Sequence, residues 1–211
     1  MKKQLFILGD SISIDYTPVL RDYLGSEWEV LRKGDIPAPE ISGEIDHENG
    51  TDSNVVYEYL RLVLPFIQAS LILLNSGLHD IKRMPNETDE CQVSIERYRK
   101  NIEKIIHLIQ SEKKQALWVT STPVDDQQHR KYETSFFRRN DDLVRYNRTA
   151  IEIMKKNNIP VFDLYNFTSR INAPLYRDHI HFNNEIINLQ AAFLSGCIQT
   201  FYSYGTRNNE E

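Results

Sequence analysis

Five short β-rich segments recur along the chain, and three of them are apolar without interruption. The segments span residues 4–8, 28–32, 70–75, 116–120 and 159–164, and the unbroken runs read LFIL, LILL and ALWV. A strand that faces water on one side alternates apolar and polar residues, so unbroken runs indicate strands covered on both faces, as in a parallel sheet. The chain is therefore expected to place helices on both sides of a sheet.

Helical patterns lie between these segments, at residues 52–64, 97–113, 141–157 and 183–204. The first pattern begins at an Asp52 cap and stops before Pro65, and the last begins at Asn183 and stops at Gly205. Repeated strand–helix alternation predicts an α/β fold, a three-layer α/β/α sandwich around a five-stranded parallel sheet with right-handed crossovers. We expect one domain over residues 1–205 and a frayed polar tail over 206–211.

The charge balance and cysteine content narrow the function. Basic residues number 25 and acidic residues 30, which gives a net charge of −5 and argues against nucleic-acid binding, since that needs a basic surface. No segment approaches the length needed to span a membrane. The two cysteines, Cys91 and Cys197, form no C-x-x-C pair, so neither a disulfide framework nor a cysteine zinc site is expected. We expect a cytoplasmic protein with no membrane partner, and the sequence leaves its oligomeric state open.

Polar and catalytic residue types follow the predicted strands, at the edge where ligands bind in such folds. The relevant segments are Gly9-Asp10-Ser11-Ile12, Gly34, Gly77-Leu78-His79-Asp80 and Asp178-His179-Ile180-His181. A serine hydroxyl needs a base within about 3 Å to become nucleophilic, and His181 is the candidate. Asp178, three residues earlier, can return its carboxylate to that imidazole and fix its tautomer. The amides of Ser11 and Gly34, with a side chain of the third loop, could stabilise an oxyanion.

These segments together resemble the SGNH hydrolases, also called GDSL hydrolases. Gly9-Asp10-Ser11-Ile12 is similar to the GDSL block, Gly34 to the second-block glycine, and Asp178-His179-Ile180-His181 to the D-x-x-H block. The resemblance covers residues 4 to about 203. It implies a flavodoxin-like sheet, no metal or other cofactor, and serine-dependent hydrolysis of esters or thioesters through an acyl-enzyme on Ser11. Small-molecule esters are the expected substrates, and carbohydrate O-acetyl esters fall within the family's range.

One position departs from the family pattern. The third block of the family is G-x-N-D, and this chain has His79 where the asparagine donates to the oxyanion. A neutral imidazole can donate one N–H, so we interpret His79 as a substituted oxyanion donor, with Asp80 holding it in the donating tautomer. The alternative is that the substitution weakens catalysis.

The neighbouring residues have plainer interpretations. Asp10 is expected to hold the turn by bonding nearby backbone, and His129 and His179 to be surface, packing or supporting residues. Gly43 is the main rival of Gly34. The charged and aromatic segment 125–142 follows the fourth strand, and it is either a solvated loop with a short helix or a wall of the substrate site.

Two other functions stay open. A metal-dependent hydrolase could use the acidic and histidine side chains of the same edge: Asp10, His79, Asp80, Asp178, His179 and His181. A non-catalytic binding module is the other alternative. The G-x-S-x-G elbow of α/β-hydrolases is absent, because Ser13 occupies the position of the second glycine.

Overall fold

Five parallel strands form the centre of the computed structural model, which describes residues 2–36, 48–84 and 90–207. Their order in the sheet is β2-β1-β3-β4-β5. The strands are β1 (Lys3–Leu8), β2 (Trp28–Arg32), β3 (Leu71–Leu74), β4 (Gln115–Val119) and β5 (Val161–Phe162). The predicted five-stranded parallel sheet is confirmed.

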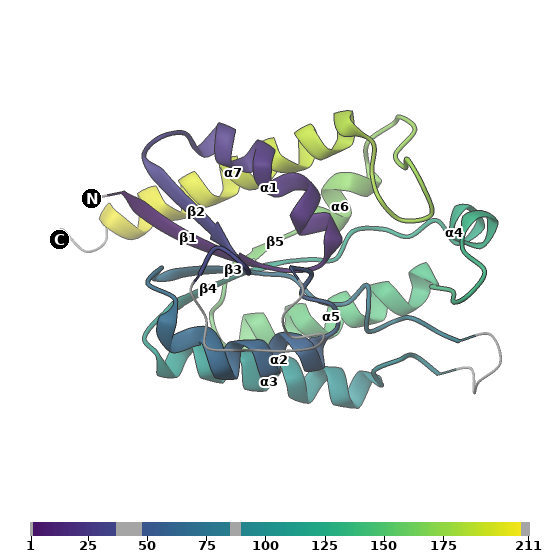
Figure 1. The fold of residues 1–211 in the computed structure, drawn as a ribbon, viewed down its shortest axis with the longest axis horizontal. Helices are drawn as coiled ribbons and strands as arrows, with labels where there is room; N and C mark the ends of the chain where they lie inside the picture. The colour runs from purple at the N-terminus through teal and green to yellow at the C-terminus, as the bar shows by residue number, and fades with distance from the viewer. Residues whose placement is uncertain (1, 37–47, 85–89, 208–211) are drawn as a thin grey trace.

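Helices cover both faces of the sheet (Figure 1). One face carries α1 (Ser11–Leu24), α6 (Leu164–Ser169) and α7 (Asn184–Arg207), and the other carries α2 (Ser53–Val63), α3 (Ile95–Ser111) and α5 (Asn140–Lys156). A 3-10 turn, η2 (Leu64–Phe66), extends α2, and α4 (Asp126–Tyr132) lies beyond one end of the sheet, apart from the two helical layers. The predicted three-layer α/β/α architecture is therefore confirmed.

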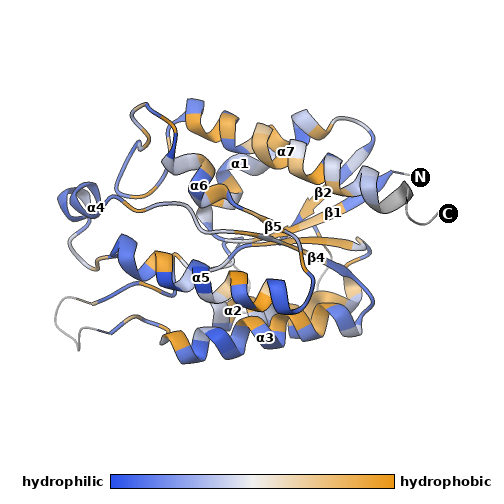
Figure 2. Ribbon diagram, turned by 180° about the vertical axis from the view of Figure 1, so that it is seen from behind, coloured by the Kyte–Doolittle hydropathy of each residue, from blue (hydrophilic) through white to orange (hydrophobic). Residues whose placement is uncertain are grey.

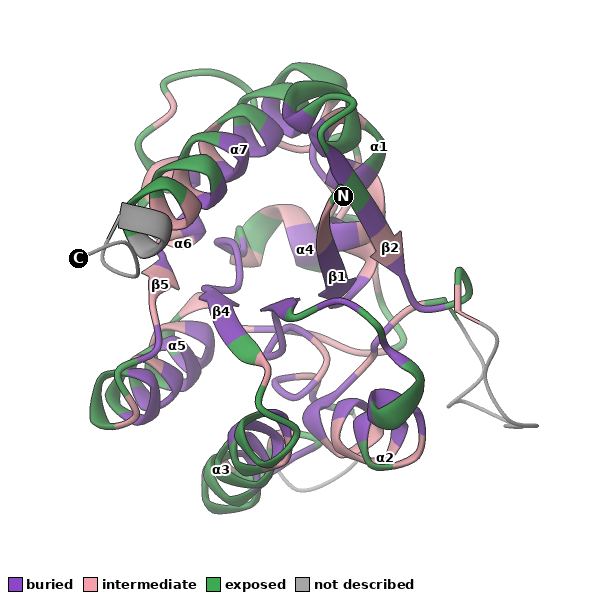
Figure 3. Ribbon diagram, turned by 90° about the vertical axis from the view of Figure 1, so that its left-hand side faces the viewer, coloured by how far each residue is buried: buried purple, intermediate pink, exposed green. Residues whose placement is uncertain are grey.

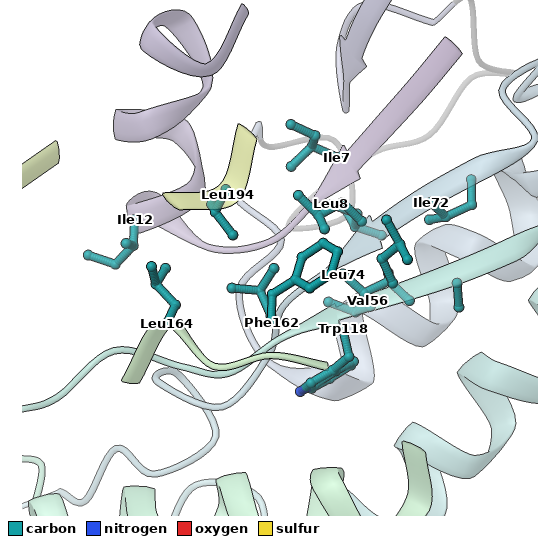
Figure 4. Packing of buried hydrophobic residues seen from close by; sticks show 14 of the residues in the cluster. Ile7, Leu8, Ile12, Val56, Ile72, Leu74, Trp118, Phe162, Leu164 and Leu194 are labelled. Carbon is teal, nitrogen blue, oxygen red and sulfur yellow. The ribbon is translucent and has the colours of Figure 1, made fainter. Parts of the chain in front are cut away.

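The apolar runs explain this layering. All four residues of β3 are buried, as are Leu5–Leu8 of β1 and Ala116–Val119 of β4. Figure 3 shows the strands buried between exposed helix surfaces, and Figure 2 shows apolar residues concentrated on the strands and on the inner sides of helices. Figure 4 shows Ile12 of α1, Leu164 of α6 and Leu194 of α7 among the packed side chains of this core.

The strand order determines where a site can form. The chain goes from β1 to β2 at one side and then returns to β3 at the other side of β1. In such sheets, ligands bind beyond the carboxyl ends of the strands where the connections diverge. That point is the end of β1, immediately before α1, and Ile7 pairs with Arg32 and with Leu73 there.

The bounds of several elements differ from prediction, among them those of the fifth strand and the last helix. The fifth strand is only Val161–Phe162, because the Asp163 side chain accepts the Asn166 N–H and starts α6 directly after it. The last helix does not stop at Gly205 but continues to Arg207, so it includes the start of the predicted tail. Glycine within a helix costs only about 0.5–1 kcal/mol relative to alanine, which leaves the helix free to continue. In the described residues no helix is long and apolar enough to cross a membrane.

Candidate active site

Ser11 is the first residue of α1 and directly follows the turn after β1. Asp10 is the helix cap, in an extended conformation, and its Oδ1 accepts the Ile12 N–H at 3.1 Å. The first N–H groups of a helix have no intrahelical partner, and the positive end of the helix dipole lies at the same place. Ser11, which is partly exposed, therefore sits where developing negative charge is favoured.

Asp10 lies buried beneath the turn that carries Ser11 and bonds nearby backbone. Its side chain is 1% exposed, and burial raises the pKa of its carboxyl above the ordinary value. The backbone carbonyl of Asp10 accepts the Ser13 hydroxyl at 2.6 Å. Asp10 therefore holds the turn that presents Ser11 and points its carboxyl into the protein.

Asp178 and His181 form a compact turn ahead of α7. Asp178 Oδ1 accepts the backbone N–H groups of Ile180 and His181, each at 2.8 Å, and Asp178 Oδ2 lies 2.8 Å from His181 Nδ1. Burial alone would raise the pKa of Asp178, but these hydrogen bonds outweigh it and lower the pKa to about 2. The carboxylate is therefore ionised and oriented toward the ring.

His181 Nε2 lies 2.9 Å from Ser11 Oγ, across 170 residues of sequence. Because Nδ1 faces the ionised Asp178, the ring carries its proton on Nδ1 and presents the Nε2 lone pair to the serine hydroxyl. The structure thus brings together the three residues predicted to be catalytic, in the order Ser11, His181, Asp178. Such a chain can remove a proton from the hydroxyl as it attacks a carbonyl.

The loop after β3 carries His79 toward this site. Gly77 has φ +150°, and a Cβ there would lie 2.7 Å from Ser121 Oγ. The loop is therefore closely packed against Ser121. His79 is partly exposed, and within the described residues its ring makes no hydrogen bond. Burial, with smaller contributions from Lys82, Arg138 and His181, lowers the pKa of His79 to about 3. His79 is therefore neutral and has one N–H to donate.

Asp80 does not orient His79, which corrects the prediction. Its buried carboxylate accepts the Ser53 N–H at 3.0 Å and the Ser76 hydroxyl at 3.0 Å. Asp80 thus joins the beginning of α2 to the loop after β3. The adjacent position in sequence suggested contact with His79, but both oxygens of the Asp80 carboxyl are bonded elsewhere, to Ser53 and Ser76.

Gly34 and Gly50 occupy different places near the end of β1. Gly34 has φ +97° in the turn closed by the Asp35 N–H on the Arg32 carbonyl, and no hydrogen bond joins it to the described residues around Ser11. Gly50, which the sequence argument missed, donates its N–H to the Gly9 carbonyl at 2.9 Å. A Cβ on Gly50 would lie 2.8 Å from that oxygen. The signal for it was its position just ahead of the Asp52 cap of α2; the rival Gly43 lies outside the described residues.

Segment 125–142 includes a short helix, is exposed to solvent in part, and also contacts the Asp178 turn. It contains α4, whose Gln128 Nε2 donates to the Asp178 carbonyl at 3.1 Å. His129 of α4 is fully buried, and its ring lies 5.0 Å from the His179 ring between centroids. The His179 ring lies 5.9 Å from that of His181. Of the two alternatives for His129, surface or packing, these contacts fit packing, and for His179 they fit a position beside His181.

The metal alternative finds no support in the arrangement of side chains. In the part of the chain that the structure describes, no group of three or more histidine, cysteine or acidic side chains could hold a metal ion. The acidic candidates have other partners: Asp10 and Asp80 accept backbone N–H groups, and Asp178 is bonded to His181.

Comparison with known proteins gives likenesses in structure alone. No protein-family profile matches the chain, and no curated protein matches it in sequence. A lipase/acylhydrolase from Enterococcus faecalis matches with a TM-score of 0.69 and 20% identity, over 94% of this chain and 96% of that one. A GDSL-like lipase from Bacteroides thetaiotaomicron matches with a TM-score of 0.67 and 14% identity, over 94% and 88%. A carbohydrate acetylesterase from Sinorhizobium meliloti matches with a TM-score of 0.62 and 12% identity, over 95% and 100%.

The chain has the fold of these acylhydrolases. The match covers nearly the whole length of each of these proteins. The resemblance to the SGNH hydrolases that the sequence motifs suggested is confirmed at the level of the fold.

Proposed function

We propose that this protein is a serine-dependent acylhydrolase that cleaves small acyl esters. The observation that carries the proposal is the chain of contacts from Ser11 Oγ to His181 Nε2 at 2.9 Å and from His181 Nδ1 to Asp178 Oδ2 at 2.8 Å. A hydroxyl, an imidazole and an ionised carboxylate in this order match the requirements of nucleophilic acyl transfer.

In the proposed reaction Ser11 Oγ attacks the acyl carbon while its proton moves to His181 Nε2. The carbonyl electron pair moves onto oxygen, giving a tetrahedral oxyanion, and Asp178 stabilises the imidazolium. Collapse of the oxyanion breaks the bond to the leaving alkoxide, which takes the proton from His181. Water then attacks the acyl-enzyme by the same route, with His181 as base and then acid, and releases the carboxylic acid and free Ser11.

The oxyanion needs donors that are already in place. The Ser11 N–H at the start of α1 and the neutral ring of His79 support the proposed hole. Gly34 is its least supported member, since no hydrogen bond among the described residues links Gly34 to the Ser11 turn. Asp10 has a supporting role, because it holds the turn that carries Ser11.

Acetyl esters, including those on carbohydrates, are the proposed substrates. Two of the structural neighbours are an acetyl xylan esterase and a carbohydrate acetylesterase, and this chain shares their fold. Thioesters undergo the same acyl transfer and belong in the same assays.

The test is hydrolysis of p-nitrophenyl esters of increasing chain length, together with acetate release from acetylated xylan. Ser11→Ala is expected to abolish turnover, and a fluorophosphonate probe should label the wild type at Ser11 and not the variant. Ser111→Ala, which removes an exposed hydroxyl at the end of α3, is the matched control and should retain full activity. Turnover that survives Ser11→Ala would refute the proposal.

A further inference from the structure

Arg138 is a buried cation that contacts no carboxylate in the part of the chain that the structure describes. Its side chain lies just before α5 and is 3% exposed. Among the described residues its guanidinium makes no ion pair, and burial lowers the pKa of Arg138 to about 10. Burying an unpaired charge is costly, so its position calls for an explanation other than stability.

The first contact of Arg138 is with the loop that carries His79. Arg138 Nε donates to the Leu78 carbonyl at 2.6 Å. Leu78 is itself buried and immediately precedes His79. A charge-assisted hydrogen bond of this kind is about twice as strong as a neutral one, so Arg138 fixes the backbone from which the His79 ring projects.

The second contact of Arg138 leads to the Asp178–His181 turn. Arg138 Nη1 lies 3.1 Å from His129 Nε2, and since an arginine can only donate, that nitrogen is the acceptor. The His129 ring packs against His179, which packs against His181. One side chain therefore connects the two segments that hold the proposed oxyanion donor and the proposed base.

The charge of Arg138 acts toward the same place. Its field favours the anionic form of Asp10, the residue before Ser11, and disfavours protonation of His79. A positive charge that is already in place inside a low-dielectric site stabilises an anion that forms during the reaction and needs no rearrangement to do so. The neutral ester before attack gains little from the same charge.

We propose that Arg138 is a positioning residue of the active site, which fixes the His79 loop against the Asp178–His181 turn and supplies positive potential to the tetrahedral oxyanion. The inference rests on the proposed acylhydrolase function. It also gives His129 and Arg138, within segment 125–142, a role in the site, whereas residues 130–132 of the same segment are exposed to solvent.

The test compares Arg138→Met, Arg138→Lys and the control Arg130→Met, which removes an exposed arginine of α4. Arg138→Met is expected to lower kcat by about 100-fold, the size that displacement of a catalytic group can produce, with KM changed less than about threefold because ground-state binding does not use the charge. Arg138→Lys keeps the charge but cannot make both hydrogen bonds. Its kcat should lie between those of the wild type and Arg138→Met. Arg130→Met should match the wild type.

A second measurement separates the electrostatic role from a loss of structure. Phenylboronic acid adds to the serine hydroxyl and forms a tetrahedral anion, so its inhibition constant should rise in Arg138→Met in parallel with the loss of kcat, while KM stays nearly constant. An unchanged kcat in Arg138→Met overturns the inference, as does an Arg138→Lys variant as slow as Arg138→Met, which would mean that the charge contributes nothing. If Arg138→Met does not fold, an unchanged kcat in Arg138→Lys also overturns it.

Ser11→Ala in the same assay distinguishes the two failures. A Ser11→Ala variant that still turns over overturns the proposed function together with the inference. An inactive Ser11→Ala beside a fully active Arg138→Met leaves the function standing and removes only the role of Arg138.

Discussion

Asp178 holds His181 at two points, through the ring and through the backbone. One carboxylate oxygen accepts the His181 N–H and the other lies 2.8 Å from His181 Nδ1. The spacing of three residues makes this possible, because a single turn returns the side chain of Asp178 to both atoms. The orientation of the imidazole is therefore fixed locally, before any contact with Ser11.

Asp178→Asn should keep the backbone contact to His181 and change the contact to its ring. The amide oxygen can still accept the backbone N–H groups, but its NH2 would face Nδ1 and force the ring proton onto Nε2, where it blocks the proton transfer from Ser11. We expect kcat to fall by about 1,000- to 10,000-fold with little change in Tm. Steady-state kinetics and thermal unfolding test this, and an active Asp178→Asn would remove the carboxylate from the mechanism.

The proposed oxyanion role of His79 predicts different results for two substitutions. His79→Ala removes the donor and should lower kcat by about 100- to 1,000-fold. His79→Asn supplies a side-chain N–H at a similar place and should recover most of that loss. Because the pKa of His79 is about 3, its ring stays neutral from pH 5 to 9, and the pH profiles of His79→Asn and wild type should have the same shape. Equal kcat in His79→Ala and wild type would assign the donor elsewhere.

Gly50→Ala tests the close approach between Gly50 and the turn before Ser11. A methyl group would lie 2.8 Å from the Gly9 carbonyl oxygen, a backbone atom that cannot rotate away. Overpacking of this kind costs about 1–3 kcal/mol, and the displaced turn should lower kcat as well. Gly196→Ala is the control: among the described residues, no atom outside the adjoining residues and its own helix backbone lies within 4 Å of the added methyl group. Urea unfolding should therefore show equal or greater stability. A Gly50→Ala protein as stable as wild type would contradict the packing argument.

Asp80 predicts how stability depends on pH. Burial raises the pKa of Asp80 to about 7, whereas in the unfolded chain it is about 3.9. Between these values the folded state binds more protons, so the free energy of unfolding should fall as pH rises from about 4 to 7. Asp80→Asn keeps an acceptor for the Ser53 N–H and a group that can bond Ser76, and carries no charge.

Denaturant unfolding at several pH values measures this effect. The pH dependence should be flatter in Asp80→Asn than in wild type, and Asp141→Asn, at an exposed position of α5, should keep the wild-type slope. A wild-type slope in Asp80→Asn would show that Asp80 is already ionised at pH 4.

Features that depend on local sequence were predictable. The unbroken apolar runs predicted the sheet, because such strands must be covered on both faces. The strand Trp28–Arg32 was predicted with its observed bounds. The predicted Asp52 cap of α2 is confirmed. It too depends on local sequence, since the Asp52 side chain accepts the Asn54 N–H two residues away.

Features that depend on distant contacts were not predictable. Two hydrogen bonds join segments far apart in sequence: one from the Gly50 N–H to the Gly9 carbonyl, and one from Arg138 to the Leu78 carbonyl. Their separation in sequence does not indicate that these segments lie close in space. Asp80 was assigned to its neighbour in sequence, whereas its partner Ser53 lies 27 residues earlier. Strand order brings these pairs together, and spacing along the chain does not reveal it.

The helices α1 and α7 pack against each other on one face of the sheet (Figure 1). Ser11 is the first residue of α1, and His181 lies three residues ahead of α7. The distance between Ser11 Oγ and His181 Nε2 therefore depends on how closely these two helices pack. Heating, denaturant or a distant core substitution that loosens their apolar contact should reduce turnover before the sheet itself melts. A loss of esterase activity would then report loosened packing between α1 and α7 before the protein unfolds globally.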